Sequence, residues 1–320
     1  MNILVTGGLG LIGHNVVKRL QDQGHIVSIV DTKTNYGIIP QEEIDYLMSE
    51  RLKKIGDVSY IYNTDITDYL GMENIFRVEE PEIVIHCASF PRQKVVNANP
   101  ILGSKVMSEG LMNLLELSDK YETRKFVYIS SSMVYGEFKD DVKEDAICKP
   151  QGQYGILKLA GEWLVKDYSR RTNLVHTIIR PSAVYGPLDV EDRVISKFML
   201  AAMRGQTLKV NGGQETLDFT YVDDAADGIV AAALNDTTEN KTYNITKSHA
   251  VTLYDAAKIA VDLAGRGKIA ITSRDLDFPS RGALNIDAAR RDFQFSPKMD
   301  VIDGFNAYYY WLKNSTYFNK

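Results

Sequence analysis

The chain has 320 residues, of which 44% are hydrophobic and 25% are charged, a composition typical of a soluble globular protein with one large or two coupled domains. Its net charge of -5 leaves no basic surface for nucleic acid or an anionic membrane, so neither is expected as a main partner. The cysteines, Cys87 and Cys148, are too few for a disulfide framework or a cysteine-rich zinc site, and they favour a reducing, cytoplasmic setting. No signal peptide or membrane span is expected.

The N-terminal segment predicts an anion-binding turn. A short apolar strand, Ile3–Val5, leads into the run Thr6-Gly7-Gly8-Leu9-Gly10-Leu11-Ile12-Gly13, and residues 14–20 then have helical spacing. Glycines let a backbone approach a pyrophosphate, and a helix start offers free N–H groups and a positive dipole end. Taken alone, the run is also compatible with a glycine-rich hairpin turn.

A second strand, His25–Val30, ends at Asp31 and completes a βαβ unit. An acid about twenty residues beyond the glycines is suited to bind the adenosine ribose hydroxyls, and its charge would repel a 2′-phosphate. The pattern therefore favours NAD over NADP. The alternative is that Asp31 only begins a loop.

Strands and helices continue to alternate through the first half of the chain. Strands are predicted at Val58–Asn63, Glu82–Ala88, Lys125–Ser131 and Leu174–Ile179, and helices at Leu70–Val78, Ile101–Lys120 and Gln153–Arg171. This order predicts a Rossmann-type α/β fold, a doubly wound parallel sheet over residues 1–180. Ligands of such sheets bind beyond the carboxyl ends of the strands.

After Tyr185-Gly186-Pro187 the alternation breaks. Helices near Val194–Arg204, Asp223–Leu234 and Leu253–Ala264 and a short strand at Leu208–Val210 predict a smaller C-terminal α/β substrate lobe over residues 181–320. The two parts are expected to be interdigitated, with residues 220–245 returning to the main domain.

Tyr154 and Lys158 lie four residues apart, on one face of a predicted helix. A lysine ammonium beside a phenol lowers its pKa and makes tyrosine a usable base. The same spacing occurs at five other places, so position singles out this pair: its helix follows the strand ending near Ser131, whose hydroxyl could bind the substrate oxygen. A surface tyrosine beside a solvated lysine is the alternative.

Nucleophilic and metal-dependent chemistry have little support. The five histidines are scattered, and no Gly-x-Ser-x-Gly elbow or metal-ligand spacing is present, so no metal site is predicted. His86 lies within a strand and is expected to be a packed, hydrogen-bonded core residue.

Together these motifs resemble the extended short-chain dehydrogenase/reductase superfamily, and most closely its NAD-dependent nucleotide-sugar epimerase/dehydratase family, of the UDP-glucose 4-epimerase type. The resemblance covers nearly the whole chain and rests on Gly7–Gly13, Asp31, Asp65-Ile66, His86-Cys87-Ala88, Ser131–Gly136, Tyr154 with Lys158, and Arg180–Pro187.

The resemblance implies a role for each matching residue. Ser131, Tyr154 and Lys158 would be catalytic. The pyrophosphate of NAD would lie on Gly7, Gly10, Leu11, Ile12 and Gly13, the adenosine ribose near Asp31 and Asn35, the adenine near Asp65 and Ile66, and the nicotinamide beyond Ala88, near Tyr154 and Lys158. Substrate would contact Ser131, Ser132, Tyr154, Arg193 and Arg281. The implied reaction oxidises a sugar hydroxyl, turns the keto sugar and reduces its other face.

Departures from the family pattern leave the substrate open. Ser132-Met133 replace the Asp-Glu pair of related 4,6-dehydratases, which disfavours dehydration. Met107 and Ala183 stand where the family often has Asn, and Leu217 where it has a diphosphate-binding Arg, whereas Arg281 matches another phosphate-binding Arg. Two kinds of substrate remain open. One is a nucleotide sugar that is bound differently from those of the family, with the help of Arg92, Lys94 or Arg193, and the other is a smaller sugar acid without a nucleotide.

An NAD-dependent nucleotide-sugar 4-epimerase is thus the first hypothesis. A sugar dehydrogenase or keto-sugar reductase is the second, and a non-catalytic NAD sensor or partner-binding module the third. A homodimer is expected, because helices 101–120 and 153–171 carry apolar residues on more than one face.

Overall fold

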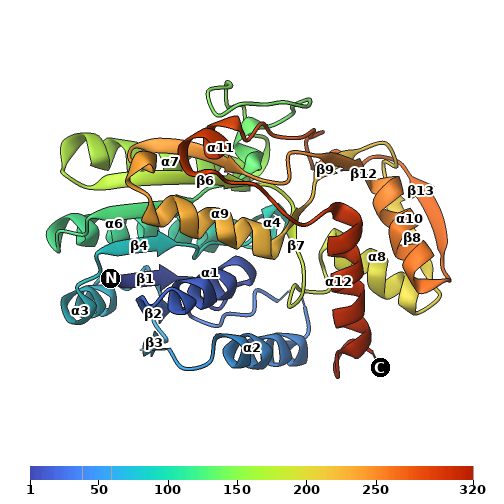
Figure 1. Ribbon diagram of the computed structural model, residues 1–320, viewed down its shortest axis with the longest axis horizontal. Helices are drawn as coiled ribbons and strands as arrows, with labels where there is room; N and C mark the ends of the chain where they lie inside the picture. The colour runs from blue at the N-terminus through green and yellow to red at the C-terminus, as the bar shows by residue number, and fades with distance from the viewer. Residues whose placement is uncertain (38, 59, 320) are drawn as a thin grey trace.

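The computed structural model describes residues 1–37, 39–58 and 60–319. Its centre is a seven-stranded parallel sheet in the order β11-β6-β5-β4-β1-β2-β3 (Figure 1). These strands are β1 (Asn2–Thr6), β2 (Ile26–Val30), β3 (Tyr60–Tyr62), β4 (Ile83–His86), β5 (Lys125–Ile129), β6 (Val175–Pro181) and β11 (Lys241–Ile245). The predicted Rossmann-type α/β fold is confirmed.

Alternate residues of each strand enter two apolar cores, one on each face of the sheet. Ile3 and Val5 pack with α1 (Leu11–Asp22), α2 (Gln41–Ile55), α9 (Val222–Leu234) and α11 (Asp287–Phe293). Leu4 packs on the other face, with α3 (Tyr69–Glu79), α6 (Leu111–Lys120) and α7 (Gly152–Arg171). Figure 1 shows α1 and α9 side by side across the front of the sheet.

The register of the sheet brings the expected site residues to one level. Thr6 at the end of β1 is opposite Val30 of β2 and His86 of β4, so Gly7, Asp31 and Cys87 follow at the same edge. His86 is buried and lies 2.7 Å from the hydroxyl of Thr6, which confirms it as a hydrogen-bonded core histidine.

The predicted helix Ile101–Lys120 is interrupted. After α4 (Gln93–Ala98) the chain forms α5 (Pro100–Ser104), a π-helical segment η1 (Lys105–Gly110) and then α6. A Cβ on Gly110 would lie 2.5 Å from the side chain of Ile66, so glycine is what lets this helix approach the end of the sheet. A π-helical turn of this kind is common beside functional sites.

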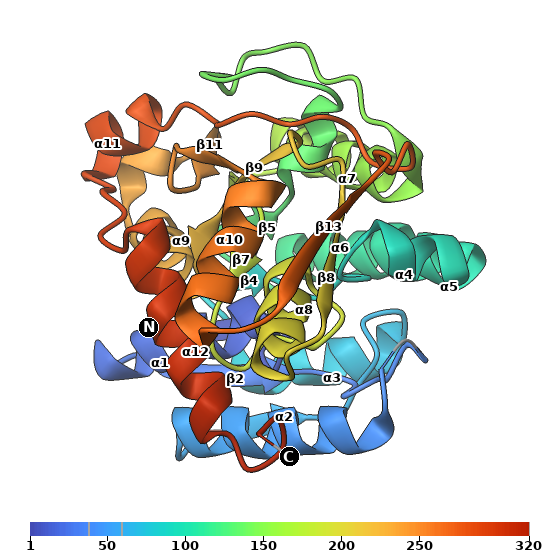
Figure 2. The same cartoon turned by 90° about the vertical axis from the view of Figure 1, so that its right-hand side faces the viewer.

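Residues after Pro181 build most of a second body beside the sheet. It contains α8 (Val194–Met203), α10 (Leu253–Ala264) and α12 (Val301–Asn314) around the buried side chains of Phe198, Met199 and Phe305 (Figure 2). Its short strands pair as β7 (Val184–Tyr185) with β10 (Thr220–Tyr221), β8 (Thr207–Asn211) with β13 (Lys268–Thr272), and β9 (Thr216–Asp218) with β12 (Ala250–Thr252). Two 3-10 turns, η2 (Ser132–Tyr135) and η3 (Asp236–Thr238), complete the elements.

Most predicted elements agree with the structure to within a few residues. The helix Leu253–Ala264 has the predicted bounds, whereas β4 and β5 are shorter than expected. The strand expected at Val58–Asn63 corresponds to β3. Ser59, which belongs to the expected range, lies outside the described residues. Helix α2 was not predicted. In the part of the chain that the structure describes, no helix is long and apolar enough to span a bilayer.

Candidate active site

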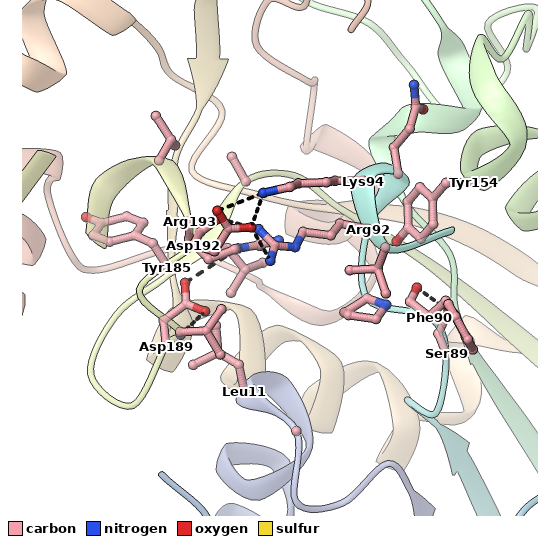
Figure 3. A pocket seen from close by; sticks show the side chains of 18 of the residues that line it. Leu11, Ser89, Phe90, Arg92, Lys94, Tyr154, Tyr185, Asp189, Asp192 and Arg193 are labelled. Atoms are coloured by element: carbon pink, nitrogen blue, oxygen red, sulfur yellow. Dashed lines mark hydrogen bonds and ion pairs between the residues drawn. The ribbon is translucent and has the colours of Figure 1, made fainter. Parts of the chain in front are cut away.

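A cavity of about 1100 Å³ opens at the carboxyl ends of the sheet strands, between the sheet and the C-terminal body (Figure 3). Every residue that the sequence assigned to the cofactor, the substrate or the catalytic set lines it. Residues from opposite ends of the chain, such as Gly7 and Arg281, therefore reach one site.

The glycine turn has the shape that a pyrophosphate requires. Gly7 has a φ of +65°, and a Cβ there would lie 2.6 Å from the backbone nitrogen of Ala88. A Cβ on Gly13 would lie 2.1 Å from the carbonyl oxygen of Gly7, so the helix start can approach the turn only without side chains. Gly10 caps α1 without a side chain, and Leu11, Ile12 and Gly13 begin the helix, where N–H groups face an anion. The residues present fit a dinucleotide.

Two side chains bind carbonyl oxygens of the turn. The Nη1 of Arg51 donates to the carbonyl of Leu9 at 2.8 Å, and the Nδ1 of His14 donates to that of Gly10 at 2.8 Å. Burial lowers the pKa of His14 to about 3, so the ring is neutral, and its Nε2 accepts from Asn15. These hydrogen bonds occupy the carbonyl oxygens of Leu9 and Gly10.

Asp31 lies at the end of β2 beside this turn. Its carboxylate accepts hydrogen bonds from the backbone N–H of Leu9 at 2.9 Å and of Lys33 at 2.8 Å. One carboxylate oxygen can accept more than one hydrogen bond, so ribose hydroxyls can still bind there. Asn35 also reaches the cavity, but its amide binds Ile39, Gln41 and Gly37 within its own loop.

The far end of the cofactor side is formed by Asp65, Ile66 and Ala88. One oxygen of Asp65 accepts from both the backbone and the hydroxyl of Thr67, and the carbonyl of Ile66 accepts from Asn113. Ile66 is buried and gives this part of the cavity an apolar floor. Ala88 lies two residues after the end of β4, and its backbone packs directly against Gly7.

Ser131, Tyr154 and Lys158 meet where β5 ends and α7 begins. The Ser131 hydroxyl acts on the phenol of Tyr154 and counteracts the rise of its pKa, and Ser131 also accepts from the backbone N–H of Met133. The Nζ of Lys158 lies 5.9 Å from the centre of the Tyr154 ring and donates to the carbonyl of Ile129 at 2.7 Å. Ser132 is buried beside them, and its hydroxyl donates to Ser182.

The expected lowering of the Tyr154 pKa by Lys158 is wrong for this structure. Burial raises the pKa of Tyr154, and the groups that counteract it are the Ser131 hydroxyl and the charges of Arg193 and Arg281. Burial also lowers the pKa of Lys158 itself to about 8, so the lysine is a weaker source of positive charge than its spacing suggests.

Arg193 and Arg281 bring positive charge to the substrate side. Burial and the charge of Arg193 together lower the pKa of Arg281 to about 10, and both guanidinium groups line the cavity. The Nε of Arg281 is buried and has no hydrogen-bond partner in the described part of the chain. Arg193 donates to the carbonyl of Val184 and lies 3.6 Å from Asp189. Two poorly paired cations beside Tyr154 suit an anionic substrate.

Arg92 and Lys94, also considered for the substrate, are paired with Asp192. The carboxylate of Asp192 lies 2.7 Å from Arg92 and 2.9 Å from Lys94 (Figure 3). It also lies 2.6 Å from Lys197. Arg92 directly precedes α4 and Asp192 lies just before α8, so this cluster joins the sheet side of the cavity to the C-terminal body. Arg92 and Lys94 thus share this one carboxylate with Lys197, so the cluster holds one negative charge for three positive charges.

Sequence reasoning missed Arg51, His14 and the buried pair Glu162–Arg180. No local pattern marks Arg51 or the Glu162–Arg180 pair, because their partners come from other elements, whereas His14 bonds to its chain neighbours Gly10 and Asn15. Metal ligation finds no support either: among the described residues there is no group of three or more His, Cys, Asp or Glu side chains that could hold an ion.

Comparison with known proteins agrees with this geometry. The model of the NAD dependent epimerase/dehydratase family matches residues 3–246. Protein CapI of Staphylococcus aureus is 30% identical over 97% of this chain and 98% of its own, and a putative UDP-glucose 4-epimerase of Methanocaldococcus jannaschii is 29% identical over 98% and 99%.

Solved structures agree over the same length. The UDP-glucuronic acid 4-epimerase of Bacillus cereus, in complex with UDP-glucuronic acid and NAD, superposes with a TM-score of 0.89 at 26% identity, covering 98% of this chain and 99% of its own. The UDP-glucose 4-epimerase of Thermotoga maritima, with UDP-glucose, has a TM-score of 0.88 at 26% identity and the same coverage. The chain therefore belongs to the NAD-dependent epimerase/dehydratase family, whose members are enzymes of the extended short-chain dehydrogenase/reductase type, and its cofactor is NAD.

Proposed function

We propose that the protein is an NAD-dependent nucleotide-sugar 4-epimerase that works through a transient keto sugar. The observation that carries this proposal is that Ser131, Tyr154 and Lys158 lie together in the same cavity as the cofactor turn and two poorly paired arginines. Proton transfer, cofactor binding and anion binding are then available within one site.

Each side chain has a chemical task in this proposal. Tyr154 accepts the proton of the sugar hydroxyl and later returns it, while Ser131 donates a hydrogen bond to the reacting oxygen. NAD, when bound, supplies a reversible two-electron oxidation of the sugar carbon. Lys158 is held in place by the carbonyl of Ile129, and the charges of Arg193 and Arg281 favour the phenolate electrostatically.

Epimerisation fits the cavity better than dehydration. Elimination of water needs a further acid and base beside the reacting sugar, and the residues that follow Ser131 are the hydroxyl of Ser132 and the buried thioether of Met133. A cavity of about 1100 Å³ leaves room for a keto sugar to turn before it is reduced on its other face.

We assign the diphosphate of the substrate to Arg193 and Arg281. Relatives that bind UDP-glucose or UDP-glucuronic acid support a UDP-sugar, and the poorly paired guanidinium groups supply the charge that a diphosphate requires. On the cofactor side we assign the pyrophosphate to residues 7–13, the adenosine ribose to Asp31 and Asn35, and the adenine to Asp65 and Ile66.

We also propose a cytoplasmic homodimer with a cofactor domain of residues 1–180 and a substrate lobe of residues 181–320, from which 220–245 return to the main sheet. Ile101 of α5 and Ile156 and Trp163 of α7 are exposed, and Gln153 ties the two helices by bonding Pro100 and Ser104. Such a patch suits an isologous contact. Trp163→Glu should convert a dimer into a monomer in sedimentation equilibrium.

The activity is tested by incubating the protein with a panel of UDP-hexoses and UDP-hexuronic acids and following C4 by NMR. Tyr154→Phe should lower turnover by about 10²–10⁴-fold while NAD binding is retained. Tyr254→Phe is the matched control, because Tyr254 has the same spacing to Lys258 on α10.

Three results would contradict the proposal. Absence of both inversion and exchange at C4 across the panel excludes a 4-epimerase of these sugars. A stoichiometric gain or loss of reduced NAD absorbance identifies a dehydrogenase or reductase. Full activity in Tyr154→Phe removes the assigned base.

A further inference from the structure

Arg51 touches both ligand sides of the molecule at once. It lies on α2, is 4% exposed, and donates through Nη1 to the carbonyl of Leu9 at 2.8 Å and through Nη2 to the carbonyl of Leu188 at 2.7 Å. Leu9 belongs to the cofactor turn. Leu188 opens the segment of residues 188–193, here named the substrate loop, which carries Asp189, Asp192 and Arg193 into the cavity.

Both carbonyls belong to backbone that is fixed from a second side. The N–H of Leu9 donates to Asp31, so the cofactor turn is held between Asp31 and Arg51. Leu188 has a φ of +69°, which strains a leucine, and the hydrogen bond from Arg51 helps to hold that conformation. Movement of either carbonyl therefore changes the geometry of the other through one rigid guanidinium.

The buried position of Arg51 is energetically unfavourable for its positive charge. In the described part of the chain no carboxylate approaches its guanidinium within 4.0 Å, and burial lowers the pKa of Arg51, with Asp189 and Asp31 counteracting from a greater distance. An apolar side chain of similar volume would fill the space at a lower desolvation cost. A bridge between two carbonyls is what a guanidinium supplies and an apolar residue does not.

Another residue of α2, Glu43, binds the substrate loop alone. Glu43 is buried on α2, and its carboxylate accepts from the backbone N–H of Glu191 at 2.6 Å. It contacts the substrate loop and not the cofactor turn. Glu43 and Arg51 therefore separate anchoring of the loop from a link between the two sites.

We infer that Arg51 is a positioning residue that couples the cofactor turn to the substrate loop. NAD fixes the turn, the carbonyl of Leu9 then fixes Arg51, and Arg51 orders the loop that presents Arg193 to the anionic group of the substrate. Coupling of this kind is reciprocal, so a ligand on the substrate loop strengthens binding of NAD by the same factor. The inference needs the NAD site and holds for any sugar.

Hydrogen exchange with NAD as the added ligand tests this link, because no sugar enters the experiment and failure of the epimerase proposal would not affect it. In the native protein, saturating NAD should slow exchange in residues 7–13 and, by about tenfold, in the substrate loop. Arg51→Lys keeps a positive charge, but one ammonium group cannot span both carbonyls. It should keep the protection of residues 7–13 and lose that of the substrate loop.

Two further variants keep the result interpretable. Glu43→Gln should speed exchange in the substrate loop with and without NAD while the slowing by NAD persists. Lys53→Met, at an exposed position of α2, should behave as the native protein. Where Arg51→Lys does not fold, Arg51→Met replaces it, since an apolar side chain removes the buried charge.

The alternatives each overturn the inference. Slowing confined to residues 7–13 in the native protein means that the sites are not linked. Slowing of the substrate loop in Arg51→Lys, as in the native protein, means that another residue carries the link. Loss of protection at both residues 7–13 and the substrate loop in Arg51→Lys means that Arg51 is needed for cofactor binding itself and does not couple the two sites.

Discussion

Glu162 and Arg180 form a buried ion pair beneath the reacting end of the cavity. The Nη2 of Arg180 lies 2.6 Å from the Oε2 of Glu162, and their side chains are 4% and 1% exposed. Glu162 also accepts from the hydroxyl of Ser130 at 2.6 Å, directly before Ser131. Burial acts to lower the pKa of the Arg180 guanidinium, but the hydrogen bond with Glu162 and the negative charges of Glu162, Tyr135 and Cys148 together outweigh burial and raise it. The pair thus fixes α7 and β6 to the end of β5.

Glu162→Gln should lower the free energy of unfolding by about 3–5 kcal/mol, because it leaves the charge of Arg180 buried without its partner. Urea denaturation measures the loss. The control is Asp167→Asn on the same helix, whose pairs with Arg170 and Arg171 are half exposed and should contribute much less, because water screens them. Equal losses in the two variants would contradict a special role for the buried pair.

Arg193→Met should move the pH dependence of turnover to higher pH. Burial raises the pKa of Tyr154 and the charge of Arg193 counteracts that rise, so removing the charge raises the pKa further. Since the phenolate is the working base, turnover rises with pH through this pKa. The measurement is kcat against pH at saturating substrate.

Lys197→Met is the control for that experiment, because Lys197 lines the same cavity but its charge is paired with Asp192 at 2.6 Å. Its profile should coincide with that of the native protein. An Arg193→Met profile that also coincides would show that Arg193 does not act on the phenol.

Local patterns in the sequence predicted the parts of the site that local chemistry determines. Glycines at 7, 10 and 13 make the turn, and the four-residue spacing puts Tyr154 and Lys158 on one helix face, as observed. Arg51 could not be found in this way, because its two acceptors are 42 and 137 residues away.

The prediction that the pKa of Tyr154 is lowered by Lys158 was wrong for a related reason. Spacing indicates which groups are neighbours along a helix, but burial and competing hydrogen bonds depend on the whole fold. The ammonium of Lys158 donates to the carbonyl of Ile129, and the charges that act on the phenol come from Arg193 and Arg281, more than thirty residues further along the chain.

His86→Gln should make the stability of the protein less sensitive to acid. Burial lowers the pKa of His86 to about 3, whereas an unfolded histidine has a pKa of about 6.5. Between these values the unfolded chain binds a proton that the folded chain excludes, so stability falls as pH falls, by about 1.4 kcal/mol per pH unit. Glutamine at this position removes that contribution.

The measurement is the free energy of unfolding at several pH values between about 4 and 6.5. His14 and His176, whose pKa values burial also lowers, to about 3 and about 4, are present in both proteins, so the difference in slope isolates His86. His249→Gln, at an exposed position, should keep the native slope. Parallel slopes for all three proteins would refute the neutral, buried state of His86.

Leu217→Arg should strengthen the binding of a nucleoside diphosphate. Leu217 lies on β9 and lines the cavity, and the neighbouring Thr216 donates to the carbonyl of Arg281 at 2.6 Å, so a guanidinium here would enter beside the two native arginines. A charge-assisted hydrogen bond contributes about 1.5–3 kcal/mol, which corresponds to an increase in UDP affinity of about ten- to hundredfold. Calorimetric titration with UDP measures this increase in affinity, with Leu217→Met as the uncharged control of similar volume.

If Leu217→Arg binds UDP no better than Leu217→Met, the diphosphate does not lie against β9. If free hexuronic acids bind the native chain while UDP does not, the substrate is the smaller sugar acid.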